Sequence, residues 1–352
     1  MKENSNISTV MPNRIGYIDA LRGFTMFLVV LEHVASMCWG VVGKGISVHD
    51  YLFQVRMPLF FFISGFVLFK DGVVWNTRHI IRFFKKKIPV QLISPFLFFA
   101  AFLFVSNIPL YDGLMDKHKA GYWFTLVLLE FFVIYAAIKW CVRDRKWASV
   151  ILVATGLTLY YFCWPQLSSG NQTVDNAFSL LSVQQWRFFI FFVLGTLTRE
   201  HFDTVQRWLD NKWLLPVCIV FYLMVNAFGD MLPVKAVPVR LMLSITGLVV
   251  VFSFFRIHQS TFSRETRLGR TMQYVGRRTL DIYLIHYFLI PKGLSYFTLF
   301  TDHPMPIIEA FTSSVIAIVI IAISLLISNV IRLSPWLAHW LFGAKIGRQG
   351  LN

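Results

Sequence analysis

The chain has 352 residues, of which 56% are hydrophobic and only 14% are charged. A soluble chain of this length would carry about a quarter charged residues, so the composition excludes an ordinary soluble protein and indicates a membrane protein. The net charge of +15 could suggest nucleic-acid binding, but the basic residues stand between long apolar runs, as in cytoplasmic loops of membrane proteins. We therefore expect membrane lipid, and no nucleic acid, as a partner.

Apolar runs long enough to cross a bilayer recur along the chain, since a spanning helix needs about 20 mostly apolar residues. The predicted fold is an all-α, polytopic membrane bundle of about ten transmembrane helices, forming a single domain over residues 1–352 with short polar tails at about 1–14 and 335–352. The ten spans lie near residues 18–40, 51–69, 89–107, 122–140, 148–164, 180–198, 213–229, 239–256, 279–298 and 311–332.

The distribution of lysine and arginine predicts the orientation. With a cytoplasmic N-terminus, the inside segments and their edges hold 25 of the 33 Lys and Arg residues, and the outside loops hold six. This bias fits an even number of helices with both termini in the cytoplasm. The polar N-terminus lacks the apolar region and cleavage site of a signal peptide. We expect a multi-pass protein of the plasma (inner) membrane.

The first predicted helix carries a polar stripe. Arg22 and His33 are eleven residues apart, which puts them about 20° from the same face and about 16 Å apart along the axis. Asp19 shares the face of Arg22, whereas Glu32 points about 100° away from His33. Charged groups in a span are functional-site candidates. The alternative is that Arg22 reaches lipid headgroups and His33 makes an interhelical hydrogen bond.

Further ionisable residues fall within later spans. Arg56 in the second helix needs an anionic or carbonyl partner, and Glu130 in the fourth helix is a candidate counter-ion for Arg56 or His33. Ser64 and Gly65, on the same helix as Arg56, form a small-residue site. Such a site is also typical of plain helix packing. His286 lies mid-span in the ninth helix.

Tyr283 precedes His286 by three residues and would lie beside it. A hydrogen bond to a neighbouring helix is the alternative role for His286.

The segment 70–88 is predicted as a strongly basic cytoplasmic loop. Arg78 and Arg82 are spaced i, i+4, and Lys85, Lys86 and Lys87 follow. Such a cluster can anchor the topology against anionic lipid, or it can bind a polyphosphate such as the nucleotide end of coenzyme A. The four scattered cysteines lack metal-ligand spacing, and the sequence has no P-loop, GxSxG or HExxH motif. No metal is expected.

Four segments in order along the chain carry a further signal. The run Tyr17 to Phe24 contains Arg22 and is followed by His33, so an arginine and a histidine are separated by ten residues in the first helix. The other segments are Arg56 to Phe66, Tyr122-Trp123-Phe124 and Gly276 to His286. Together they resemble the acyltransferase-3 family of integral membrane O-acyltransferases, whose hallmark is this arginine and histidine pair, in the form without a periplasmic hydrolase-like domain.

The resemblance implies transfer of an acyl group, most often acetyl from acetyl-CoA, to a hydroxyl of a surface glycan or lipid-linked sugar. We expect His33 to be the general base, because imidazole titrates near neutral pH. Glu130 and Arg56 are the other catalytic candidates, with Arg56 stabilising an oxyanion or binding an anionic sugar. The donor would be bound by Arg22, Arg78, Arg82 and Lys85, and the acceptor by Asp19, Ser64, Trp123, Tyr283 and His286.

Whether the acyl group moves directly or through an acyl-His33 intermediate stays open at this stage. A second hypothesis is an ion-coupled transporter or flippase that moves a glycolipid without acyl chemistry, since buried Arg, Glu and His suit a carrier. The missing internal repeat counts against it. A third hypothesis is a non-catalytic membrane partner, which so many intramembrane charges disfavour.

Overall fold

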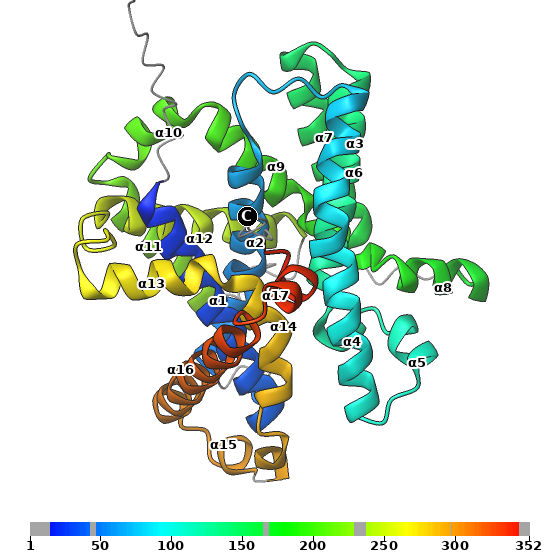
Figure 1. Cartoon of the computed structure of the whole chain (residues 1–352). Helices are drawn as coiled ribbons and strands as arrows, with labels where there is room; N and C mark the ends of the chain where they lie inside the picture. Colours follow the sequence, from blue (N-terminus) through cyan, green and yellow to red (C-terminus); the bar gives the residue numbers. More distant parts are fainter. Residues whose placement is uncertain (1–14, 43–46, 165–168, 229–236, 297, 345–352) are drawn as a thin grey trace, which may run out of the picture.

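The computed structural model describes residues 15–42, 47–164, 169–228, 237–296 and 298–344. Within these ranges the regular structure is helical throughout (Figure 1). The first half contains α1 (Gly16–Val34), η1 (Ala35–Trp39), α2 (His49–Leu68), α3 (Thr77–Ile88), η2 (Pro89–Ile93), α4 (Ser94–Val105), α5 (Leu110–Met115), η3 (Lys119–Gly121), α6 (Trp123–Cys141) and α7 (Arg145–Cys163). The second half contains α8 (Gln172–Leu180), η4 (Val183–Phe188), α9 (Phe189–Glu200), α10 (Phe202–Leu209), α11 (Leu214–Ala227), α12 (Val237–Ile257), α13 (Arg267–Arg277), α14 (Thr279–Leu289), η5 (Lys292–Tyr296), α15 (Leu299–Asp302), α16 (Pro306–Ile331) and α17 (Pro335–Phe342).

The described residues contain 7 helices long and apolar enough to cross a membrane, or up to 9 if each of two bent helix pairs is one span. The bent pairs are α8 with η4–α9, at 50°, and α10 with α11, at 76°. The ninth predicted span, 279–298, corresponds to α14, which has 11 residues. The protein is therefore an all-helical, multi-pass membrane protein.

Two segments differ from the sequence prediction. Residues 77–88 of the expected loop 70–88 form α3, which continues through η2 into α4 as one spanning helix of 29 residues (Figure 1). The alternation of basic and apolar residues in α3 suits a helix at a membrane boundary better than a loop. Residues 335–342 of the expected C-terminal tail form α17, which packs on α4 through Phe342 and Phe98; residues 1–14 and 345–352 lie outside the described ranges.

Glycines let two pairs of helices approach closely. A Cβ at Gly23 of α1 would meet the backbone of Met272 in α13, and a Cβ at Gly276 would meet the backbone of Asp19. Gly65 of α2 and Gly195 of α9 approach each other's helix backbones in the same way. Small residues at such crossings allow the close packing that holds membrane helices together, so Gly65 has the packing role considered from the sequence.

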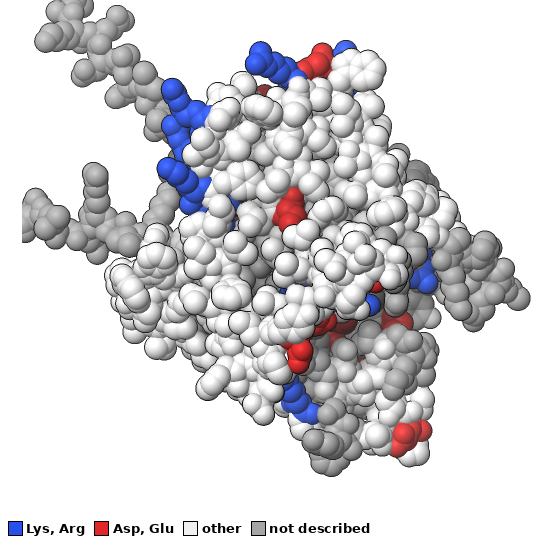
Figure 2. Space-filling model, turned by 90° about the vertical axis from the view of Figure 1, so that its right-hand side faces the viewer, with Lys and Arg blue, Asp and Glu red and all other residues white. Residues whose placement is uncertain are grey.

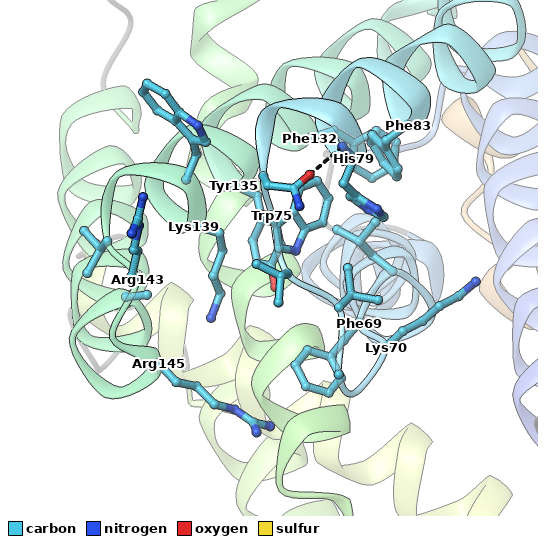
Figure 3. Close-up of a pocket in the computed structure, with 18 of the residues that line it drawn as sticks. Phe69, Lys70, Trp75, His79, Phe83, Phe132, Tyr135, Lys139, Arg143 and Arg145 are labelled. Carbon is cyan, nitrogen blue, oxygen red and sulfur yellow. Dashed lines mark hydrogen bonds between the residues drawn. The ribbon is translucent and has the colours of Figure 1, made fainter.

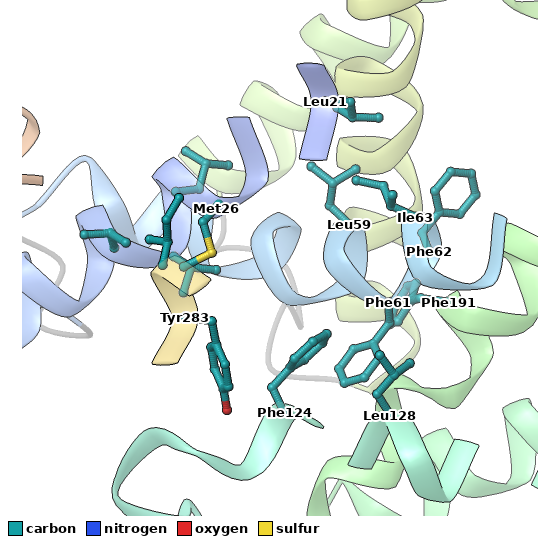
Figure 4. Close-up of a cluster of buried hydrophobic side chains, with 14 of the residues drawn as sticks. Leu21, Met26, Leu59, Phe61, Phe62, Ile63, Phe124, Leu128, Phe191 and Tyr283 are labelled. Carbon is teal, nitrogen blue, oxygen red and sulfur yellow. The ribbon is translucent and has the colours of Figure 1, made fainter. Parts of the chain in front are cut away.

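Aromatic and aliphatic side chains fill the space between α1, α2, α6 and α9. Figure 4 shows Phe61 of α2 between Phe124 and Leu128 of α6 and Phe191 of α9. Phe61 is fully buried, and its ring lies 4.9 Å from the rings of both Phe124 and Phe131. The outer surface is also apolar: large parts of the face in Figure 2 are free of charged side chains, as a lipid-facing surface requires.

Candidate active site

Side chains of α1 and α14 meet around His33, near the end of α1. The Nδ1 atom of His33 lies 3.3 Å from a carboxylate oxygen of Glu32, and the Nε2 atom lies 2.8 Å from the hydroxyl of Tyr287. The His33 side chain is 24% exposed, so a small group can reach it. The negative charge of a carboxylate beside Nδ1 favours a proton on that nitrogen, which leaves Nε2 as the basic nitrogen.

Glu32 also forms an ion pair with Arg56 of α2. The two side chains are 14% and 11% exposed, and the pair gives each charge the partner that burial demands. The sequence-based expectation that Glu32 points away from His33 is wrong. The long Glu32 side chain reaches across the helix surface to lie between His33 and Arg56, where the attraction of the guanidinium stabilises it.

Glu130, the counter-ion considered from the sequence, lies elsewhere in the bundle. It accepts a hydrogen bond of 2.7 Å from the indole nitrogen of Trp186 in η4. Its other carboxylate oxygen is buried, and no described group donates a hydrogen bond to it. The structure thus gives the position beside Arg56 and His33 to Glu32.

A strained turn before α6 holds Tyr287 in place. Lys119, Ala120 and Gly121 all have positive φ values, of 47°, 48° and 100°. Non-glycine residues adopt this conformation only where surrounding contacts enforce it. The Gly121 carbonyl accepts a hydrogen bond from the Tyr283 hydroxyl (3.1 Å), and it shares the single hydroxyl proton of Tyr287 (3.2 Å) with Nε2 of His33. A Cβ at Gly121 would collide with the Tyr287 ring. The turn therefore positions the hydroxyl that faces His33.

The Lys119 ammonium closes this turn by donating to the backbone carbonyls of Asp116 (2.8 Å) and Ser179 (2.6 Å). Burial lowers the pKa of Lys119 to about 8, so the group is still protonated at neutral pH and able to donate.

His286 completes the cluster from α14. Its ring centroid lies 5.4 Å from that of His33 and 4.1 Å from that of Tyr287. Its side chain is fully buried, and Nδ1 donates to the Ile282 carbonyl at 3.0 Å. The Nε2 atom is buried without a hydrogen-bond partner among the described residues. The structure thus brings His33, Arg56, Tyr283 and His286 of the predicted site together.

A second polar feature is a large cleft between the end of α2, α3, the end of α6 and the start of α7, called here the α3 cleft. Its volume is about 1170 Å³, which matches sites for large ligands. Figure 3 shows Arg143 and Arg145 on one side and Lys70 on the other, with Trp75 and Tyr135 between them. The lining includes five Lys and Arg residues, Lys70, Lys87, Lys139, Arg143 and Arg145, and one acidic residue, Asp71.

Aromatic rings form much of the wall of the α3 cleft. The Trp75 ring lies 5.3 Å from Phe83 and 5.4 Å from Tyr135, with both pairs edge to face. The Lys87 ammonium lies 5.0 Å from the Phe132 ring centroid, and the Lys139 ammonium lies 5.9 Å from that of Tyr135. Cations beside aromatic walls suit a ligand that combines phosphate groups with a flat ring.

A small cavity of about 120 Å³ extends the α3 cleft toward α1. It shares Ser64, Val67, Lys87 and Phe132 with the cleft, and Arg22, Thr25, Phe60 and Gln91 are among its other lining residues. Phe60 lies one helical turn from Arg56 along α2, and its ring packs on Phe124 at 4.5 Å. The cavity therefore points toward the His33 cluster and ends one turn before it.

The remaining predicted site residues lie outside both features. Arg78, Arg82 and Lys85 are exposed on α3, on the helix face opposite Phe83 and Lys87, which line the cleft. Asp19 is buried against α13. Trp123 packs at the start of α6 against the rings of Phe61, Phe124 and Phe188.

The sequence reasoning did not identify Tyr287, Gly121 and Trp75 as site residues, nor the role of Glu32. It named Lys87 only as one member of the basic cluster. Tyr287 follows Tyr283 by four residues, so the helical repeat that paired Tyr283 with His286 could have found it. Lys87 is also four residues from Phe83, so the same helical repeat would have placed it on the face of Phe83, apart from the rest of the basic cluster. For Gly121 the sequence carries no comparable signal.

The family model described as an acyltransferase domain (Acyl_transf_3) matches residues 15–332. The chain belongs to the acyltransferase-3 family. The match contains α1 with its Arg22 and His33, the α3 cleft and α14, and membership makes the protein a membrane acyltransferase. Neither a curated protein nor a solved structure matches it.

Proposed function

We propose that this acyltransferase moves an acyl group, most often acetyl, from acyl-CoA to a hydroxyl of a surface glycan or lipid-linked sugar. The observation that carries the proposal is the contact of Glu32, His33 and Tyr287. The Tyr287 hydroxyl lies where an acceptor hydroxyl would have to lie to lose its proton to Nε2 of His33. Arg56 stands beside this pair and is suited to the negative charge of the tetrahedral intermediate.

The α3 cleft is the proposed donor site. Coenzyme A combines an adenine ring with three phosphate groups, and the cleft offers Trp75 and Tyr135 for the ring and Lys70, Lys87 and Lys139 for the phosphates. The small cavity beside Arg22 would take the flexible arm of the donor toward Phe60. Arg78, Arg82 and Lys85, exposed on α3, would attract the anionic donor from a distance.

The proposed orientation places the α3 cleft in the cytoplasm, with both termini, in the inner membrane. Cys141 tests this directly, because it is exposed and lines the cleft. In a variant that keeps Cys141 as its single cysteine, an impermeant thiol reagent should label the protein only after the cells are permeabilised. Labelling in intact cells would reverse the proposed orientation.

The activity is tested with radiolabelled acetyl-CoA and purified protein in the presence of candidate glycans. Ester formation on a glycan hydroxyl supports the proposal. Movement of a glycolipid across a vesicle membrane without consumption of the donor would instead support the transporter hypothesis.

A further inference from the structure

A pair of arginines lies at the end of α7 that is remote from the α3 cleft. The guanidinium carbon of Arg187 in η4 lies 5.1 Å from the centroid of the Trp164 ring, and that of Arg240 in the first turn of α12 lies 4.9 Å from it. Both arginines are half-buried. The acyl-transfer site described above uses neither of them.

These two charges lack a counter-ion among the described residues. None of the ion pairs found there involves Arg187 or Arg240. The Nε atom of Arg187 is buried without an acceptor, and one of its terminal nitrogens has only the Gln185 side-chain oxygen at 3.4 Å. A buried guanidinium nitrogen without an acceptor is costly, and an oxyanion that accepts from both guanidinium groups would remove the cost.

The position of the pair indicates where such an anion comes from. Arg145, at the start of α7, lines the α3 cleft, and α7 has 19 residues. A helix of that length spans about 28 Å, close to the thickness of the hydrocarbon core of a bilayer. Trp164 and its two arginines therefore lie at the opposite membrane boundary, at the level of lipid phosphates.

The surface next to the pair is open to lipid. Tyr161 and Phe162, in the last turn of α7, are 46% and 58% exposed. Aromatic side chains at this level are typical of the membrane interface. An apolar chain can lie along these rings while its phosphate reaches the arginines.

We propose that Arg187 and Arg240, together with Trp164, form a binding site for the phosphate group of a membrane lipid. The guanidinium groups bind the phosphate oxygens, and the lipid chain packs on the exposed rings of α7. The phosphate belongs either to a bilayer phospholipid or to an isoprenoid carrier of the acceptor sugar. The binding site does not depend on acyl transfer, so its test needs no acyl donor.

The test measures binding of farnesyl phosphate to the purified protein in a neutral detergent, with farnesol as the uncharged control ligand. Arg187→Gln and Arg240→Gln should each weaken binding of farnesyl phosphate about tenfold or more, as expected for loss of a charged hydrogen-bond donor. Arg207→Gln is the matched control, because Arg207 is exposed on α10, and it should leave the affinity within about twofold.

Equal affinity for farnesol and farnesyl phosphate would overturn the proposal, as would unchanged affinity in Arg240→Gln. The second variant keeps the test decisive even if Arg187→Gln fails to fold. A short-chain phosphatidylglycerol identifies the source of the phosphate. Affinity equal to that of farnesyl phosphate assigns the site to bilayer phospholipid, and a preference of about tenfold for farnesyl phosphate assigns it to an isoprenoid-linked acceptor.

Discussion

The polar groups around His33 are matched to one another, whereas those of the α3 cleft face an open space. Both ring nitrogens of His33 contact protein groups, and Glu32 joins His33 to Arg56. The α3 cleft instead places five basic side chains around about 1170 Å³, and one of them, Arg145, forms ion pairs with Glu200 and Asp71. A reacting group must be held in one orientation, while a site for a large, flexible ligand needs volume and unpaired charge. The difference separates the residues expected to change turnover from those expected to change donor affinity.

The largest effect is expected at His33. His33→Ala removes the proposed general base and should lower kcat by about 10²–10⁴-fold with little change in donor affinity. Turnover is measured with labelled acetyl-CoA and affinity by calorimetry. His286→Ala is the comparison, because His286 is fully buried and bonded to its own helix. It should mainly lower thermal stability. A folded His33→Ala protein that keeps more than about a tenth of the turnover would remove His33 from the role of base.

Glu32→Gln tests whether the carboxylate orients His33 or only neutralises Arg56. Loss of the negative charge should lower kcat about ten- to a hundredfold, and it should also lower thermal stability, because Arg56 loses its ion pair. The double variant Glu32→Gln with Arg56→Gln should recover stability without recovering turnover. Recovery of both would show that the carboxylate serves only the ion pair.

Variants at Lys87 and Arg82 test the role of the α3 cleft within a single helix. Lys87 lines the α3 cleft, and Arg82 is exposed on the opposite face of α3. Lys87→Gln should raise the KM for acetyl-CoA about tenfold at unchanged kcat, because a phosphate loses a charged partner. Arg82→Gln should change the KM about twofold at most, since distant surface charges are screened by salt. The reverse ranking would place the donor on the exposed face.

The smallest effect is expected at Tyr287. Tyr287→Phe keeps the ring that packs on His33 and His286 but removes the hydroxyl that contacts Nε2 and the Gly121 carbonyl. One neutral hydrogen bond is worth about 1 kcal/mol, so kcat should fall about fivefold. A loss as large as that of His33→Ala would instead give Tyr287 a direct part in proton transfer.

The sequence by itself determined the helical class, the position on one helix of Arg22 and His33, and seven of the ten predicted spans, with two more if each bent helix pair is one span. Span length follows from the thickness of the bilayer, and residues on one helix are related by a fixed rotation and rise. Arg22 and His33 indeed lie on α1 as predicted, with Arg22 at the small cavity and His33 in the polar cluster.

Only the tertiary structure decided which side chains meet His33. The position of Glu32 depends on Arg56 from α2, and Tyr287 is held by a turn some 166 residues earlier in the chain. Likewise, Lys87 is separated from Arg82 and Lys85 because residues 77–88 form a helix, one face of which borders the α3 cleft. Such contacts depend on the crossing of helices and the rotation of each about its axis. Close packing between distant segments sets these crossings and rotations. The periodicity of a single segment carries no information about them.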